Sequence, residues 1–252
     1  MKLPLVSIIT PTFNSEKFII DTYKSISAQS YINWEWVVTD DCSNDNTIQA
    51  LYKIREADDR VKVHINDKNL GAAWSRNCSL EHAQGCYFAF IDSDDIWYPN
   101  KLKKQMEFML ENDVEFSFTA YELINENGKK LNKVIDSHHK NKVFSYNDML
   151  YKKATLGCST AIISRELVGS KRMPNIRTAQ DYAFWLSILK DNNRAYLIPF
   201  IGTQYRIVAS SISRNKIKKA KRQWEVYRQC EKLGFFKSLM CFSSYAVRAV
   251  TR

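Results

Sequence analysis

The chain has 252 residues, 45% of them hydrophobic, and a formal net charge of +10. This length allows one large domain, or one domain with an appendage, and a core large enough to fold without disulfides. Residues 214–252 hold eleven Lys or Arg against two Glu, so the rest of the chain is close to neutral, without the basic face that a nucleic-acid-binding domain carries.

The first half of the chain alternates short apolar runs with helical patterns. The apolar runs predict strands at residues 5–10, 35–40, 61–65 and 87–92. Apolar residues spaced three and four apart predict helices at residues 16–29, 44–57, 71–84 and 99–112. We expect Pro11 to end the first strand and Ser15 to cap the first helix. This alternation predicts an α/β fold with a Rossmann-like, mostly parallel sheet covered by helices.

After residue 112 the regular alternation gives way to a mixture of strands and helices. The pattern predicts strands at residues 114–121, 159–164, 195–198 and 202–208, and helices at 148–154 and 178–191. The remainder indicates basic amphipathic helices. We therefore divide the chain into residues 1–112, residues 113–214 as the second half of the same domain, and a C-terminal helical extension, 215–252.

Cysteine usage and hydropathy indicate the compartment. The six cysteines form no CxxC pair and no cluster with His, which argues against a zinc site or a disulfide framework and favours free thiols in a reducing cytoplasm. No apolar run reaches the roughly 18 residues of a membrane-spanning helix. The apolar N-terminal run is short and is interrupted by Pro11, so we expect no signal peptide and a cytoplasmic protein.

Polar residues follow three of the expected strands. These stretches are TPTFN (10–14), TDDCSND (39–45) and DSDD (92–95). Ligands of parallel sheets bind beyond the carboxyl ends of the strands, where such loops meet. Carboxylates and hydroxyls gathered there suit a hard cation and a sugar-rich ligand. The chain has neither GxGxxG nor GxxxxGK[ST], which argues against a hydride-transferring Rossmann enzyme and a P-loop ATPase.

Five ordered motifs carry a resemblance to a known family. VSIITPTFN, VVTDDCSNDNT, NLGAAWSRN, FIDSDDIWYP and AQDYAFWL, spread over about residues 4 to 207, resemble family 2 glycosyltransferases of the GT-A fold. The likeness is greatest to bacterial enzymes that build O-antigen or capsule repeat units. It implies metal-dependent inverting transfer, with Mn²⁺ or Mg²⁺, from a nucleotide diphosphate sugar, expected to be a UDP-sugar. The acceptor would be a hydroxyl of a lipid-linked (undecaprenyl diphosphate) glycan, and the product β-linked.

The resemblance also assigns roles to residues. Residues 1–112 would bind the donor, and residues 113–214 the acceptor. Asp181 would be the catalytic base, Asp94 would hold the metal, and Gly157 and Cys158 would lie near the acceptor or donor sugar. The donor would be bound by Pro11, Thr12, Phe13, Asp40, Asp41, Arg76, Asp92 and Ser93.

Some neighbouring positions receive other readings. We expect Asp95 to be a structural turn acid. Val208 stands where the family often carries a His that touches the metal or diphosphate, so the metal would rely on Asp94, diphosphate and water. Paired Asp residues after a strand can also be turn and cap residues. Asp181 can act on a helix dipole, and Arg76 can be a surface ion-pair residue.

Two other functions compete with glycosyl transfer. A sugar-phosphate nucleotidyltransferase would share an α/β sheet with acidic metal sites, but such enzymes usually carry a Gly-rich loop and a basic residue after the first strand, which TPTFN lacks. The other is a non-catalytic nucleotide-sugar-binding module, which a sugar-transfer assay would distinguish from an enzyme.

The basic C-terminal extension has two readings of its own. It can lie as interfacial helices on an anionic membrane surface, which would attach the protein peripherally to the inner face of the cell membrane. Alternatively it packs on the domain or on the partner in an oligomer.

Overall fold

The computed structural model describes residues 3–137, 142–208 and 216–251. In its first half, strands and helices alternate as β1 (Val6–Thr12), α1 (Ile19–Ser27), β2 (Trp34–Asp40), α2 (Thr47–Ala57), β3 (Val61–Ile65), α3 (Ala72–His82), β4 (Tyr87–Phe90), β5 (Ile96–Trp97) and α4 (Lys101–Glu111). This order confirms the alternation read from the sequence.

The second half completes the sheet and adds the C-terminal helices. Its elements are β6 (Phe116–Asn125), β7 (Lys130–Ile135), β8 (Val143–Phe144), α5 (Tyr146–Leu150), a 3-10 turn (Cys158–Thr160), β9 (Ile162–Ser164), α6 (Arg165–Val168), α7 (Gln180–Leu189), β10 (Ala195–Ile207), α8 (Lys216–Glu225), a π-helical turn (Val226–Cys230) and α9 (Phe235–Thr251).

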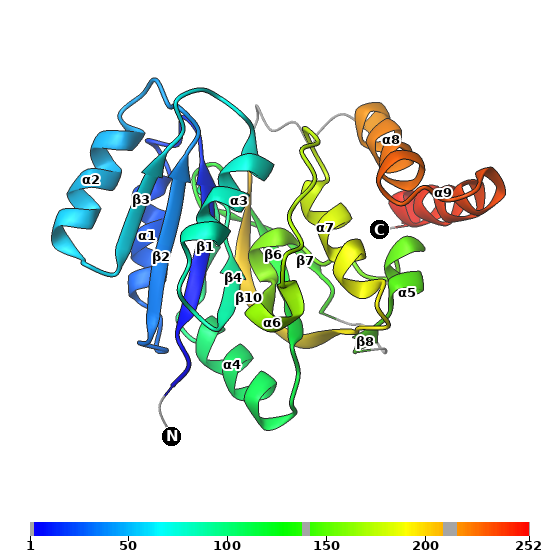
Figure 1. The fold of residues 1–252 in the computed structure, drawn as a ribbon, viewed down its shortest axis with the longest axis horizontal. Coiled ribbons are helices and arrows are strands. Elements are labelled where there is room, and N and C mark those ends of the chain that lie inside the picture. Colours follow the sequence, from blue (N-terminus) through cyan, green and yellow to red (C-terminus); the bar gives the residue numbers. More distant parts are fainter. Residues whose placement is uncertain (1–2, 138–141, 209–215, 252) are drawn as a thin grey trace.

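One large sheet runs through both halves (Figure 1). Its strand order is β3-β2-β1-β4-β9-β6-β10-β5, with β7 on β6 and β8 on β10, ten strands among the described residues. The four strands β1 to β4 are mutually parallel. Since β9 is antiparallel to both β4 and β6, and β10 is parallel to β6, six strands share one direction. The α/β fold with a mostly parallel sheet is therefore confirmed.

The apolar strands form two cores because both faces of the sheet are covered. Successive residues of a strand point to opposite faces, so Ile8 belongs to one core and Ile9 to the other, as do Val38 and Val37. One core is closed by α1, α2 and α4, and the other by α3 and α7. Continuous apolar runs are what such doubly covered strands require.

The predicted end of the first strand and start of the first helix need correction. The first strand continues through Pro11 to Thr12, because β4 already ends opposite Ile9 and leaves β1 paired on one side only, where a missing N–H is tolerated. The first helix begins at Ile19, and Ser15 does not cap it. The Ser15 hydroxyl instead bonds the Ser93 hydroxyl at 2.8 Å.

The strands expected at 195–198 and 202–208 are one strand, β10, with register shifts between Ile198 and Thr203. Pro199 lies inside the shift and has no N–H to donate to the ladder. At Gly202 a Cβ would come within 2.6 Å of the Thr119 hydroxyl, so only glycine fits. The expected strand 159–164 shortens to β9, because residues 158–160 form the 3-10 turn.

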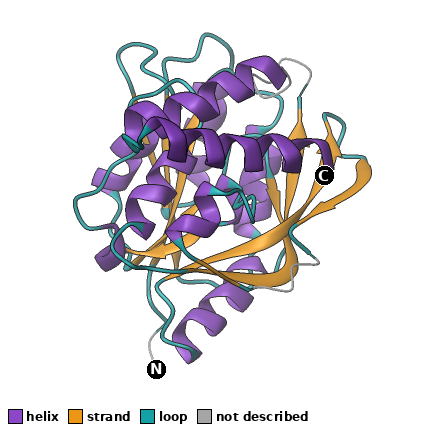
Figure 2. Ribbon diagram, turned by 90° about the vertical axis from the view of Figure 1, so that its right-hand side faces the viewer, coloured by secondary structure: helices purple, strands orange, loops and turns teal. Residues whose placement is uncertain are grey.

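The C-terminal helices pack on the domain. The Tyr227 hydroxyl donates to the Leu150 carbonyl at 2.7 Å, and the Ser244 hydroxyl donates to the Tyr151 carbonyl at 2.9 Å. Val226 and Tyr227 are buried, and the Trp224 ring meets that of Phe242 edge-on. Figure 2 shows α9 running across the side of the molecule toward the C-terminus. Of the two readings of the extension, packing on the domain is thus confirmed.

A helix that crosses a bilayer needs about 20 consecutive, mostly apolar residues. No helix among the described residues is both long enough and apolar enough to span a membrane.

Candidate active site

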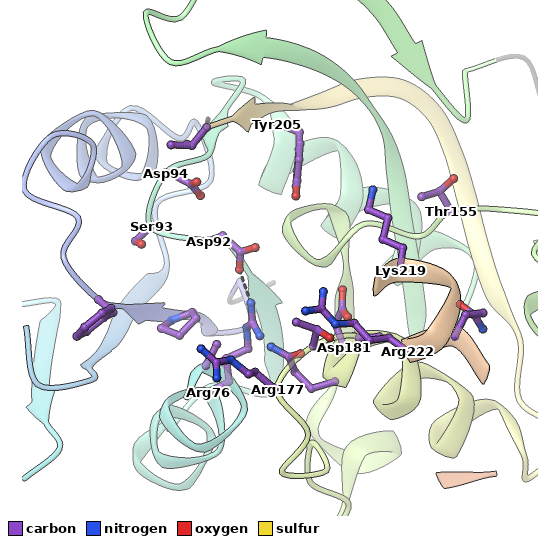
Figure 3. Close-up of a pocket in the computed structure, with 18 of the residues that line it drawn as sticks. Arg76, Asp92, Ser93, Asp94, Thr155, Arg177, Asp181, Tyr205, Lys219 and Arg222 are labelled. Atoms are coloured by element: carbon purple, nitrogen blue, oxygen red, sulfur yellow. Dashed lines mark hydrogen bonds and ion pairs between the residues drawn. The ribbon is translucent and has the colours of Figure 1, made fainter. Parts of the chain in front are cut away.

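A large pocket opens at the carboxyl ends of β1 and β4. Its cavity volume is about 1180 Å³, and its walls come from these strand ends, from the starts of α3 and α7, from the end of β10 and from the C-terminal helices (Figure 3). Convergence of strand-end loops on one cavity is the arrangement in which parallel sheets bind ligands.

Most of the residues singled out in the sequence meet in this pocket. Those that line it are Pro11, Thr12, Phe13, Asp41, Arg76, Asp92, Ser93, Asp94 and Asp181. Figure 3 shows Asp92, Ser93 and Asp94 on the loop after β4, with Arg76 and Asp181 on neighbouring helices. Five motifs far apart in the sequence are thus brought to one cavity.

Three of the predicted residues lie behind the pocket wall. The Asp40 carboxylate accepts hydrogen bonds from the Ser43 amide at 2.8 Å and the Ser43 hydroxyl at 2.6 Å. Asp40 therefore supports the loop that carries Asp41. Gly157 packs against the Tyr121 ring at 3.4 Å from where its Cβ would stand, and Cys158 is buried. A contact between these two residues and a sugar stays a prediction.

The loops after β1 and β2 present an aromatic ring and a carboxylate to the pocket. Phe13 is 44% exposed, so it is not a core residue and its ring is available to a planar ligand. The Asp41 carboxylate accepts from the Leu70 amide at 2.8 Å and the Gly71 amide at 2.7 Å. With a third bond from Asn66, Asp41 is held in place and retains one of its roughly four acceptor positions.

Arg76 is paired and still has donors to spare. Its Nη2 contacts Asp92 Oδ1 at 2.5 Å, although Arg76 lies inside the pocket wall and is only 5% exposed. Burial acts to lower the pKa of the guanidinium, but Cys158, Asp92 and Asp181 together raise it above its usual value. Its Nε and Nη1 have no hydrogen-bond partner within the described part of the chain. Buried donors without partners are rare, and here they suit an anionic ligand.

The loop after β4 is held from two sides. The Thr22 hydroxyl on α1 contacts the carbonyls of Ser93 and Asp95 at 3.0 and 2.9 Å. Arg206 on β10 donates from Nε to the Asp94 carbonyl at 2.7 Å and from its amide to the Asp95 carboxylate at 2.8 Å. Asp95 is fully buried and also accepts from the Ser159 hydroxyl. It is the structural acid that the sequence predicted.

The two carboxylates Asp92 and Asp94 face the pocket from this loop. Burial, and then the charge of Asp92, raise the pKa of Asp94 to about 7, against the opposing effect of Arg206 and Arg76. A divalent cation would relieve that repulsion with hard oxygen ligands. Within the described residues no group of three or more His, Cys, Asp or Glu could hold a metal alone. These carboxylates therefore fit a divalent cation that takes its remaining oxygen ligands from a bound diphosphate.

Asp181 lies in the first turn of α7, across the pocket from this loop. Helix α7 is anchored below it, because the Tyr182 hydroxyl donates to the Met149 carbonyl at 2.9 Å and Trp185 is fully buried. The packing of Tyr182 and Trp185 thus fixes the position of the Asp181 carboxylate at the pocket.

The sequence reasoning missed several residues that line this pocket or support its wall. Arg206, which holds the Asp94 loop, belongs to a strand whose pattern gives no sign of that contact. Arg177 precedes α7, and the basic residues Lys219, Arg222 and Arg248 belong to the C-terminal helices. The only signal for the latter was the clustering of positive charge in the extension, which says nothing about where the helices fold.

Comparison with known proteins identifies relatives over the whole chain. The sequence profile described as Glycosyl transferase family 2 matches residues 7–169. TuaG of Bacillus subtilis (strain 168), a candidate glycosyltransferase of teichuronic acid biosynthesis, is 47% identical over 249 residues, which are 99% of this chain and 97% of TuaG. The Escherichia coli UDP-Glc:alpha-D-GlcNAc-diphosphoundecaprenol beta-1,3-glucosyltransferase WfgD is 42% identical over 224 residues, 88% of this chain and 85% of WfgD.

Solved structures share the fold. S. aureus TarS 1-349 in complex with UDP-GlcNAc superposes with a TM-score of 0.70 at 25% identity, covering 89% of this chain and 65% of that one. In a second, longer structure of S. aureus TarS, the superposition covers 38% of the TarS chain. PcManGT of Pyrobaculum calidifontis, a mannosyltransferase in complex with GDP-Man and Mn²⁺, superposes with a TM-score of 0.69 at 20% identity, over 97% of this chain and 70% of that one.

These findings confirm the resemblance and set the nucleotidyltransferase alternative aside. A family profile that covers more than half of the chain and a relative nearly half identical along its whole length agree with the fold around the pocket. The chain belongs to glycosyl transferase family 2 and is a glycosyltransferase of the GT-A fold.

Proposed function

We propose that this glycosyltransferase transfers a sugar, with inversion, from a UDP-sugar to a hydroxyl group of a lipid-linked glycan during synthesis of a surface polysaccharide. The observation that carries the proposal is the pocket itself, where Asp181 lies across from Asp92 and Asp94 and beside the unpartnered donors of Arg76. The relatives add support, since WfgD is named for UDP-Glc and a diphosphoundecaprenol acceptor, and TarS was solved with UDP and UDP-GlcNAc.

In this proposal each group has one task. Phe13 stacks on the base of the donor, and Asp41 bonds its edge. An acceptor hydroxyl is a poor nucleophile, so Asp181 takes its proton as the oxygen attacks the anomeric carbon. A single in-line displacement needs one base and converts an α-linked donor into a β-linked product, unlike the carboxylate pair of a glycosidase.

The leaving diphosphate needs positive charge. Arg76 would donate from Nε and Nη1 to the oxygens on which charge develops. Asp94, with Asp92 beside it, would hold Mn²⁺ or Mg²⁺, which when bound stabilises the leaving diphosphate as a Lewis acid.

A thermal-shift panel tests the donor. We expect UDP-sugars to raise Tm in the presence of Mn²⁺ or Mg²⁺, because a ligand at 100 times its Kd stabilises the folded state by about 2.7 kcal/mol. GDP- and CMP-sugars serve as matched controls. The best UDP-sugar is then tested for transfer to a synthetic lipid-diphosphate sugar, with the product anomer read by NMR. Stabilisation by GDP-sugars alone, or an α-linked product from an α-linked donor, would contradict the proposal.

We also propose that the enzyme works at the inner face of the cell membrane, held there by α9. While one side of this helix packs on the domain, large apolar side chains face outward: Phe235 is 57% exposed, Phe236 80%, Met240 61% and Val247 63%. Apolar side chains on a helix from the part of the chain with most of the net positive charge suit an anionic lipid surface.

Vesicle flotation tests this attachment. Deleting the extension is a poor test, because Val226 and Tyr227 belong to the core. We expect the double change Phe236→Ser and Met240→Ser to abolish flotation with vesicles of phosphatidylglycerol, while Ile32→Ser, which removes a 70% exposed apolar residue elsewhere, leaves it intact. Wild-type binding should weaken as salt rises. Equal flotation of the double variant and the wild type would disprove the attachment.

A further inference from the structure

Acidic and basic side chains enter the pocket from different elements. Asp92 and Asp94 from the loop after β4 lie on one side, while the C-terminal helices supply Lys219, Arg222 and Arg248 to the other. Figure 3 shows Lys219 and Arg222 extending from α8, across the cavity from Asp92 and Asp94. Helices that the sequence marks only as a basic extension therefore form one wall of the catalytic pocket.

The cavity is larger than one small-molecule ligand needs. Its volume of about 1180 Å³ exceeds the roughly 300–1000 Å³ of ordinary ligand pockets. The donor's place is defined by Phe13, Asp41 and Arg76 at the strand ends, so the remaining space lies toward the C-terminal helices. A transferase must hold its donor and its acceptor at the same time. The acceptor can therefore bind against the wall formed by the C-terminal helices.

Two of the basic groups on this wall, Lys219 and Arg248, make no hydrogen bond or ion pair with the described residues. Burial lowers the pKa of Lys219, and no carboxylate acts to raise it. Arg248 is half-buried in the pocket wall and, within the described residues, makes no hydrogen bond or ion pair. A ligand with two or more negative charges would supply the partners that these cationic groups lack.

We infer that Lys219, Arg222 and Arg248 form the subsite for the diphosphate of the lipid-linked acceptor, an inference that rests on the proposed function. The acceptor hydroxyl must reach Asp181, so the sugar lies between the acids and the C-terminal helices. The diphosphate at its other end then meets the basic wall. The donor's own diphosphate is served by Arg76 and Asp94 on the opposite side.

The two faces of helix α9 fit this assignment. Phe242, Tyr245 and Arg248 of α9 face the pocket, whereas Phe236 and Met240 face outward. A lipid attached to the diphosphate would leave the pocket at the helix that carries the exposed apolar side chains. Helices α8 and α9 would thus bind the diphosphate of the lipid-linked acceptor on one face and contact the membrane on the other.

Two soluble acceptors test the inference. Both carry the same sugar on a short alkyl chain, one through a diphosphate and the other as a plain glycoside. We expect the wild type to prefer the diphosphate, and Lys219→Gln and Arg248→Gln each to raise the KM for it by about tenfold, the loss expected for one charge-assisted contact. The KM of the plain glycoside and that of the UDP-sugar should stay unchanged.

Lys221→Gln is the matched control, since Lys221 lies on the same helix, is exposed, and does not line the pocket. Titration with the alkyl diphosphate alone, without its sugar, gives a readout independent of turnover, and the two variants should bind it about tenfold more weakly than the wild type and Lys221→Gln.

The other outcomes separate the sources of phosphate. A raised KM for the UDP-sugar would assign the cluster to the donor's diphosphate, and weakened vesicle flotation with unchanged acceptor KM would assign it to membrane phospholipid. Either result overturns the subsite. Transfer by the wild type without preference for the diphosphate also overturns it while the proposed function stands, whereas no transfer to either acceptor removes both.

Discussion

Replacing Asp181 by asparagine is expected to lower sugar transfer by about 10²- to 10⁴-fold, the contribution of a positioned general base. The amide keeps the size of the side chain but cannot take the proton of the acceptor hydroxyl. Transfer is measured with the UDP-sugar that stabilises the wild type most. Because Asp181 faces the acceptor in our proposal, the thermal shift given by that UDP-sugar should be unchanged.

The nearby Asp191 provides the control for this change. It follows α7, is exposed and pairs with Lys171 at 3.0 Å, so Asp191→Asn should transfer sugar at the wild-type rate. Normal transfer by Asp181→Asn would remove Asp181 as the base. A loss of UDP-sugar binding in that variant would instead show that α7 positions the donor.

Replacing Asp94 by asparagine is expected to remove metal-dependent UDP binding and transfer, and at the same time to stabilise the protein without ligands. Burial and Asp92 raise the pKa of Asp94 to about 7, so the folded state holds a proton more tightly than the unfolded state does. The protonated Asp94 carboxyl therefore adds to the free energy of unfolding at low pH, and this contribution is lost as the pH rises from about 4 to 7.

The measurement is a set of Tm values without ligand between pH 5 and pH 8. Wild type should lose stability over this range, and Asp94→Asn should lose less, with a gain near pH 8 on the order of 1 kcal/mol or about 2–4 °C. Asp59→Asn, at an exposed site, should change neither Tm nor transfer. Metal-dependent UDP binding that survives in Asp94→Asn would refute the assignment of the metal to Asp94.

The Asp94 prediction rests on the crowding of carboxylates at the end of β4. Asp92, Asp94 and Asp95 repel one another, and the pKa of Asp95 is raised well above its usual value by burial and then by its two neighbours. The surrounding fold supports this arrangement through Thr22 on α1 and Arg206 on β10. Strain of this kind is retained where it prepares a site for its ligand.

Much of the pocket wall at the strand ends could be predicted from the sequence. Apolar runs followed by TPTFN, TDDCSND and DSDD place their polar residues at one sheet edge, because parallel strands present the same ends together. The prediction reached Asp41, Asp92 and Asp94 for this reason. It was less accurate for Asp40, since adjacent residues on a strand point to opposite sides, and the pattern cannot say which of the two acids faces the ligand.

The sequence by itself determined the alternation of strands and helices, the family, and the acids at the strand ends. These are encoded within a few residues of one another, in period, turn chemistry and motif order. Only the tertiary structure decided that β10 is one strand, that Arg206 holds the Asp94 loop, and that Lys219 and Arg248 line the pocket. Those contacts join segments up to 112 residues apart, and they depend on how helices pack, which an amphipathic pattern leaves open because it specifies a buried face but not the surface that covers it.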